Sequence, residues 1–377
     1  MKDKGLSRAK KEQFMRALNK FKISVLSLFA ALVIVAIVIW ISGYSPFDIY
    51  ARIFKGAFGS KMSIALIFSE ATPLMFSGLA FAIAFKARII NVGVESQMIM
   101  GALVGAIAGA YIHGLPHMAH VTLTLLLAGM SGMLIGFFIC FLKVRFHAQE
   151  VVICIMMNSI LLYVGSYLAN GPLKAVGAGV AQTETILETA KLTKLIPKSQ
   201  LTTGFLIGAA IAIALAFILE RTVLGYKIRV AGNNRIAGET YGIQATKLYY
   251  ITFMLSGFIA AIGGSVLTQG VIMRFSDGAV SGYGFRGISV AALAMYNPLG
   301  VIFSSTLFGI LNAGSQAVNR TTTIPYEFVD VIQVMVVVFI SAPQIIQAVE
   351  KFFGDRLKKA LPKRPAAAKP DQELPRA

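Results

Sequence analysis

The chain has 377 residues, of which 56% are hydrophobic and only 14% are charged, and its formal net charge is +18. Soluble domains carry about 25% charged residues, so this composition excludes an ordinary soluble globule and predicts an all-α membrane protein. The basic residues flank apolar runs instead of forming one basic face, which argues against nucleic-acid binding. Cys140 and Cys154 fall in or beside apolar runs and favour packing over a disulfide.

Eight Lys/Arg lie within residues 1–22, ahead of an apolar run over 23–41. That run is too long for a signal peptide and no convincing cleavage site follows it. We therefore expect a basic cytoplasmic N-terminus and an uncleaved first span. Further spans are expected over residues 62–85, 94–111, 121–142, 151–168, 201–219 and 248–270. Beyond Asp277 come a short run over 285–296, a run to about residue 317 and a last span over 328–349.

Counting the short run, the pattern predicts about ten transmembrane helices within a membrane domain over 23–349. Both termini are expected in the cytoplasm. The tail 350–377 is basic and rich in Pro and Ala, which predicts a disordered end. The run 285–296 is too short to cross alone, so it is either extended by helix on each side or re-entrant. The sixth span separates two blocks of four spans that begin from opposite sides, which is the arrangement of two inverted-repeat halves.

A polar segment, residues 220–247, interrupts the apolar runs and carries five Lys/Arg, which predicts a cytoplasmic location. Asn233 or Asn234 is a suitable helix N-cap and Gly242 a suitable stop, so a short helix is expected between them. Such a helix either docks into a groove of another protein or belongs to a solvated loop that only fixes the topology. Composition alone favours the solvated loop.

Polar residues inside the apolar runs are the candidates for function. Glu70 lies just before Thr72-Pro73, where we expect proline to break the helix and leave carbonyl groups without partners. Asn91, Glu95 and Gln97 gather at the start of a span and are able to bond a hydroxylated ligand or a neighbouring helix. Asn158 and Asn312 are isolated polar residues, which more often join helices than bind ligands.

The sequence also bears on catalysis and metal binding. The sequence has no phosphate-binding loop, no nucleophile elbow and no zinc-binding His-Glu-x-x-His helix, so neither ATP hydrolysis nor a cofactor is predicted for this chain. His113, His117 and His120 have a zinc-like spacing, but Pro116 interrupts them and no nearby Cys or carboxylate completes a set. We expect an interfacial loop there and no metal site.

Several motifs in a shared order resemble permeases of ABC importers in the branched-chain amino acid/simple-sugar superfamily, and within it the nucleoside branch linked to basic membrane lipoproteins. The similarity covers roughly residues 60–350. The motifs are Ala-Thr-Pro-Leu-Met-Phe-Ser-Gly-Leu-Ala over 71–80, Ile-Asn-Val-Gly-Val-Glu-Ser-Gln-Met over 90–98, Leu-Gly-Tyr-Lys-Ile-Arg-Val-Ala-Gly-Asn-Asn over 224–234, residues 237–243, residues 255–264, Gly-Phe-Arg-Gly-Ile-Ser-Val-Ala from Gly284, and Asn-Pro-Leu-Gly over 297–300.

The resemblance implies a multi-pass subunit of the bacterial inner membrane, surrounded by membrane lipid. It also implies a second permease, like or unlike, two cytoplasmic ATPase subunits, and an external lipoprotein that delivers the solute. Segment 220–247 becomes the coupling loop that docks on the ATPase, through Arg235, Ala237, Gly238, Glu239, Tyr241 and Gly242. The translocation pathway is expected near Glu70, Pro73, Asn91, Glu95, Gln97, Asn158 and Phe285.

The sequence departs from the family pattern at two positions. Ser96 replaces the usual Gly of the Glu-Gly-Gln signature, and Arg286 stands where Asp is common, which suggests a different ligand or a partner permease of complementary charge. A nucleoside is the expected solute, with riboflavin or a simple sugar as alternatives. An ion-coupled secondary transporter is the rival from a different class, for which Glu70 and Glu95 would be the ion-binding acids.

Overall fold

The computed structural model describes residues 33–37, 39–41 and 43–321. The segment 1–22, residues 23–32 of the first expected span, the last expected span and the tail 350–377 therefore lie outside the described residues. All the elements named there are helices. They are α2 (Pro46–Phe58), α3 (Lys61–Lys86), α4 (Val94–Tyr111), α5 (His117–Phe146), α6 (Glu150–Asn170), η1 (Glu188–Ala190), α7 (Gly204–Arg221), α8 (Val223–Asn233), α9 (Arg235–Thr240), α10 (Ala245–Leu267), η2 (Thr268–Ile272), α11 (Tyr283–Leu293) and α12 (Pro298–Thr321).

Seven helices in the described part of the chain are long and apolar enough to cross a membrane, and a bent pair formed by 33–41 and α2 would make eight. The seven are α3, α4, α5, α6, α7, α10 continued by η2, and α12. Each coincides with an expected apolar run. The prediction of an all-α, multi-pass membrane protein is therefore confirmed, and the expected total of about ten spans reaches beyond the described residues.

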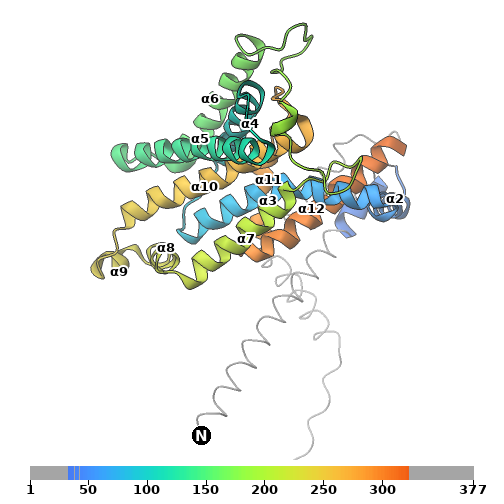
Figure 1. The fold of residues 1–377 in the computed structure, drawn as a ribbon. Coiled ribbons are helices and arrows are strands. Elements are labelled where there is room, and N and C mark those ends of the chain that lie inside the picture. The colour runs from blue at the N-terminus through green and yellow to red at the C-terminus, as the bar shows by residue number, and fades with distance from the viewer. Residues whose placement is uncertain (1–32, 38, 42, 322–377) are drawn as a thin grey trace, which may run out of the picture.

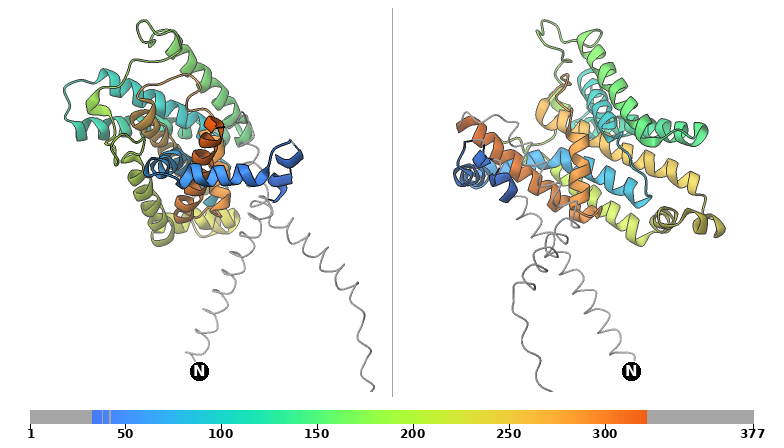
Figure 2. Two further views of the ribbon diagram at one scale, coloured as in Figure 1. Left: turned by 90° about the vertical axis from the view of Figure 1, so that its right-hand side faces the viewer. Right: turned by 180° about the vertical axis from the view of Figure 1, so that it is seen from behind.

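The spans run between two ends of the molecule, as Figures 1 and 2 show. At one end lie α8 and α9, and we call it the α8–α9 end. At the opposite end α2 lies beside α12, where Ile53 of α2 packs on Gly314 and Gly56 on Ala317. The helix α2 was not expected. It buries Ile49, Ile53 and Ala57, which are four residues apart and so share one helical face.

The helices α3 and α10 occupy equivalent places in the bundle. The helix α3 packs on α10, α11 and α12, whereas α10 packs on α3, α4 and α5. Exchanging α3 with α10, α4 with α11 and α5 with α12 therefore reproduces the same set of neighbours. This is the pairing that two inverted-repeat halves predict.

Glycines let α5 and α10 approach each other to backbone contact. A Cβ atom added at Gly132 would lie 2.2 Å from the carbonyl oxygen of Gly257, and one at Gly136 would lie 2.3 Å from the carbonyl oxygen of Phe253. Because lipid is as apolar as a leucine side chain, membrane helices associate through such close packing of small residues. The two helices are thus joined along their length.

Two non-helical segments interrupt the bundle in equivalent places. Residues 87–93 leave the α8–α9 end and lead into α4, which begins beside the middle of α10, where Asn91 bonds Ser256. Residues 273–282 leave the opposite end and lead into α11, where Gly287 packs on Ser77 in the middle of α3. Irregular backbone at this depth is tolerated because protein surrounds it.

The expected run 285–296 is consequently one half of a broken crossing. Its helical part, α11, starts midway along α3 and ends near Tyr296, whose ring stacks on Phe85 at a centroid distance of 3.6 Å. Since Phe85 lies at the α8–α9 end of α3, the chain passes from one end of the bundle to the other. This course favours a crossing over a segment that returns to its own side.

The prediction that Pro73 breaks its helix is wrong. The helix α3 continues without interruption from Lys61 to Lys86 with Pro73 inside it. Proline removes one amide donor, but here the surrounding turns are buried against α7, α10, α11 and α12. Packing on several sides holds the helix where intrinsic propensity would end it.

The long polar segment between α6 and α7, residues 171–203, covers the end of the bundle opposite α8 and α9. Its backbone amides bond the last turns of the spans, from Leu187 to the Gly109 oxygen and from Leu192 to the Gln269 oxygen, 2.9 and 3.1 Å respectively. His117 and His120 fasten it from α5, since both rings lie within hydrogen-bond distance of Thr189. These two histidines therefore serve the packing of this segment.

Candidate functional site

The helices α4 and α11 meet at their N-terminal ends. The Glu95 carboxylate, in the first turn of α4, accepts hydrogen bonds from the amides of Gly282 at 2.5 Å and Phe285 at 3.2 Å. These amides belong to the unsatisfied first turn of α11, where a negative charge is stabilised by the helix dipole. Glu95 is buried, so one acid of the first half caps a helix of the second half.

Glycine is required for this junction. A Cβ atom at Gly284 would lie 2.4 Å from the Glu95 Cα atom and 2.6 Å from its backbone nitrogen, and backbone atoms cannot move aside. Gly282 has a φ of +90°, in the left-handed region that favours glycine. The sequence Gly282-Tyr-Gly284 thus sets how closely the two halves approach.

A second cluster holds the non-helical segment 87–93 in place. The Asn91 amide donates to Gln97 Oε1 at 3.1 Å and to Ser256 Oγ at 2.8 Å, and Ser256 Oγ donates to the Ala80 oxygen at 2.7 Å. Asn91, Gln97 and Ser256 have no exposed surface. The network therefore joins α3, α4 and α10, and Asn91 and Gln97 do not reach a solvent-filled path in this conformation.

Asn158 of α6 also holds the segment 87–93 and the start of α4 in place. Its Oδ1 accepts the Ser96 amide at 3.0 Å, and its Nδ2 donates to the Val92 oxygen at 3.1 Å. The Ser96 hydroxyl donates to the Gly93 oxygen at 2.7 Å, so the serine found in place of the usual glycine closes the first turn of α4. Asn158, predicted as an isolated polar residue, thus joins Asn91, Glu95 and Gln97 around one helix start.

Glu70 belongs to a different cluster, nearer the end that carries α2. Its carboxylate accepts Gln316 Nε2 at 2.9 Å and Asn312 Nδ2 at 3.4 Å, both from α12. Arg286 of α11 attracts the same carboxylate, so the unusual arginine has a partner of opposite charge within the chain. Phe285, next to it, leaves 45% of its surface exposed.

The segment 220–247 forms two helices where one was expected. The unexpected helix α8 starts at Thr222, whose hydroxyl accepts the Gly225 amide at 3.2 Å. The expected short helix is α9, and the turn after it closes at Gly242, which has a φ of +76°. Ile236 and Tyr241 are 79% and 84% exposed, while Gly238 is buried against α8. The segment thus offers two large apolar side chains at one end of the bundle.

A multi-pass helical protein whose two halves meet through broken helices has the architecture of a membrane transport protein. The chain belongs to the family described as branched-chain amino acid transport system / permease component, which it matches over residues 63–341. Permease subunits of this kind are not themselves enzymes and work with an ATPase and a substrate-binding protein. This agrees with the expected family, to which the motifs from Ala71 to Gly300 pointed.

Three relatives match over most of their lengths. The guanosine ABC transporter permease protein NupP of Bacillus subtilis is 28% identical, with 92% of this chain and 99% of the relative covered. The nucleoside ABC transporter permease protein NupB of Lactococcus lactis is 27% identical, with 87% and 93% covered. The glucose ABC transporter permease protein TsgB13 of Haloferax volcanii is 26% identical, with 84% and 86% covered.

Proposed function

We propose that this chain forms the membrane pathway of an ATP-driven importer whose solute is a nucleoside. The observation that carries the proposal is its likeness, over nearly their whole lengths, to permeases named for guanosine and for nucleosides. A glucose permease is almost as similar, so a simple sugar is the second candidate. The few charges among the spans suit a neutral polar solute such as either of these.

The coupling to ATP is assigned to the α8–α9 end. The six residues expected to contact the ATPase, Arg235, Ala237, Gly238, Glu239, Tyr241 and Gly242, all lie in or directly after α9. Ile236 and Tyr241 are large apolar groups that water would otherwise surround, and a groove on another protein would bury them. Closure of the ATPase pair would then push α9 and, through α10, the bundle.

The remaining partners and the orientation follow from the same assignment. The five Lys/Arg of segment 220–247 favour a cytoplasmic location for the α8–α9 end. In this proposal the chain lies in the inner membrane of a bacterial cell, and both of its termini are in the cytoplasm. A second permease would complete the pathway, and an external lipoprotein would deliver the solute at the opposite end.

The pathway residues divide into two groups. Phe285 and Glu70 keep exposed surface and are assigned to the pathway itself. Pro73, Asn91, Glu95, Gln97 and Asn158 are buried and bonded or packed, and are assigned to holding α3, α4 and α11 behind it. An aromatic ring in the first group suits a heterocyclic base, which stacks on such rings.

Uptake measured in membrane vesicles tests the solute. Vesicles carrying this chain with its ATPase, second permease and binding lipoprotein are loaded with ATP and given labelled guanosine, uridine, riboflavin, ribose or glucose. Uptake of the nucleosides above vesicles that lack this chain supports the proposal. Uptake of a sugar or of riboflavin alone overturns the solute but leaves the permease assignment standing.

The energy source is tested in the same vesicles. With the proton and sodium gradients clamped at zero, uptake should continue with ATP and stop when ATP is depleted. Uptake that persists without ATP and follows an ion gradient would overturn the importer assignment and favour a secondary transporter.

A further inference from the structure

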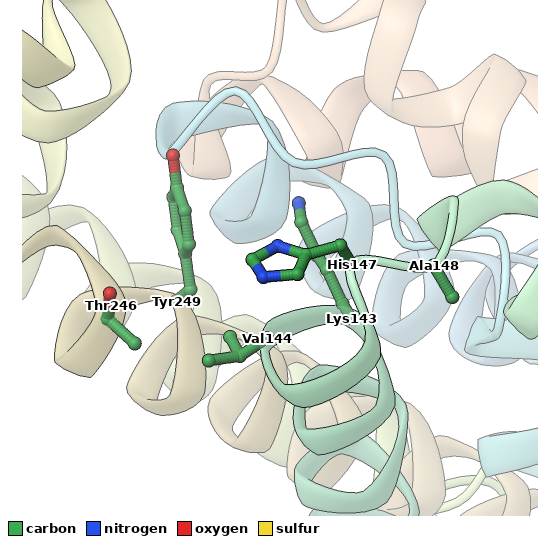
Figure 3. A pocket seen from close by; sticks show the side chains of 6 residues that line it. All are labelled: Lys143, Val144, His147, Ala148, Thr246 and Tyr249. Atoms are coloured by element: carbon green, nitrogen blue, oxygen red, sulfur yellow. The ribbon is translucent and has the colours of Figure 1, made fainter.

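A hollow of about 260 Å³ lies between the last turn of α5 and the first turn of α10. Its lining residues are Lys143, Val144, His147, Ala148, Thr246 and Tyr249. Figure 3 shows the side chains of Lys143, His147 and Tyr249 around the same space. His147 ends α5 in the left-handed conformation, with a φ of +54°, a region in which histidine is enriched over most residues.

The hollow lies where both helices leave the apolar layer. The apolar run of α5 ends at Leu142, and Lys143 and Arg145 occupy its last turn. Tyr249 and Tyr250 follow closely after the start of α10. Tyrosine and basic residues together at helix ends mark the boundary between acyl chains and headgroups. The hollow therefore opens at the level of the lipid headgroups.

Its surroundings favour an anion. Lys143 is held in place by an ion pair with Glu150, and its ammonium lies 4.9 Å from the centre of the Tyr249 ring. An ammonium has three donors, so the single pair leaves it able to bond a second oxygen. Thr246, which also lines the hollow, offers a hydroxyl.

An apolar surface leads away from the hollow along α5. Phe137 and Phe141, four residues apart on one face, are exposed and stack at a centroid distance of 6.4 Å. The Phe137 ring also contacts Tyr250 of α10 at 5.4 Å, so the surface bridges the two helices. Leu134 and Met130 are exposed one and two turns further along. An extended hydrocarbon chain could lie over this row.

We propose that this hollow binds the phosphate headgroup of an anionic phospholipid, with an acyl chain along Met130, Leu134, Phe137 and Phe141. Lys143 bonds the phosphate and His147 and Thr246 complete the headgroup contacts. A second hollow, of about 560 Å³, is lined by Glu239 and residues 242–247 and shares Thr246 with the first. The lipid would therefore lie directly beside the segment that joins α9 to α10. This site goes beyond the proposed transport of a solute.

The test is lipid retention by the purified full-length chain, measured by native mass spectrometry after incubation with phosphatidylglycerol or phosphatidylcholine. The wild-type chain should retain phosphatidylglycerol preferentially. The substitution Lys143→Gln should weaken that retention about fivefold, because one basic residue near an anionic membrane contributes on the order of 1 kcal/mol. Lys143→Arg should preserve it.

Lys191→Gln is the matched control. Lys191 is also ion-paired and 25% exposed, compared with 26% for the Lys143 side chain, but it lies at the opposite end of the bundle. Its substitution should leave phosphatidylglycerol retention unchanged. Equal loss in both variants, equal retention of the two lipids, or no loss in Lys143→Gln would overturn the site.

Discussion

The α4–α11 junction and the α8–α9 end place their key side chains in opposite surroundings. At the junction, Glu95 is buried and bonded to two amides, and glycines bring the backbones into contact. At the α8–α9 end, Ile236 and Tyr241 are almost fully exposed, and a Cβ atom at Gly238 would meet its nearest neighbour only at 3.6 Å. The junction is complete within one chain, whereas α9 exposes surface suited to a second protein.

This difference separates two kinds of effect that a substitution can have. A change at the junction should lower the stability of the chain itself, because the contacts that it removes are made within the chain and Glu95 is buried. A change on the exposed face of α9 should leave the chain stable and alter only what it binds. Three substitutions test this separation, and their effects on stability are expected to decrease in the order given.

Glu95→Ala should be the most damaging, because it removes the buried carboxylate that accepts hydrogen bonds from the amides of Gly282 and Phe285. An amide left without its acceptor costs about 1–3 kcal/mol, so the loss for two amides should lower the free energy of unfolding by roughly 2–6 kcal/mol. The midpoint of thermal aggregation in detergent measures the effect. Glu95→Gln keeps one acceptor oxygen and should recover part of the loss; if it were as unstable as Glu95→Ala, the hydrogen bonds would not be the cause.

Gly284→Ala should be intermediate, because the added methyl group meets the backbone of α4 at 2.4 Å. Overpacking of this kind costs about 1–3 kcal/mol. Gly238→Ala is the control, since its methyl group meets only ordinary contacts and should change the stability by less than about 0.5 kcal/mol. Equal aggregation midpoints for the two variants would contradict the close approach of α4 and α11.

Tyr241→Ala should leave the aggregation midpoint unchanged, because the side chain is 84% exposed. If α9 docks in the ATPase, the loss of a buried aromatic anchor should weaken association by about 2 kcal/mol, which is roughly thirtyfold in Kd. Co-purification with the ATPase measures this. Tyr226→Ala, on the neighbouring helix α8, removes another exposed tyrosine and should leave association intact; equal weakening by both variants would argue against α9 as the docking element.

The spans of this fold could be predicted from the sequence, because bilayer thickness fixes how long an apolar run must be. The helix α4 was expected over 94–111 and has those bounds in the structure. The amphipathic helices α2 and α8 were missed because each is too short to produce a span-length apolar signal. The break predicted at Pro73 was wrong for a related reason. Local propensity favours a helix end at proline, but packing of the neighbouring helices around α3 keeps the helix continuous.

The candidate site could be predicted only in part. Asn91, Glu95, Gln97 and Asn158 were identified as unusual polar residues, but their partners were not. Ser256 is 165 residues from Asn91, and Gly282 is 187 residues from Glu95. No local pattern reports contacts over such separations, because they arise only when α4 packs against α10 and α11. Whether these residues serve transport stays a prediction.

The glycine contacts between α5 and α10 restrict how this protein can deform. With carbonyl oxygens seated at Gly132 and Gly136, neither helix can slide along the other without a steric collision. The two helices must therefore move together as one rigid body. A small displacement at its α9 end would be transmitted as rotation to the far end, where residues 171–203 are fastened to α5 by His117 and His120.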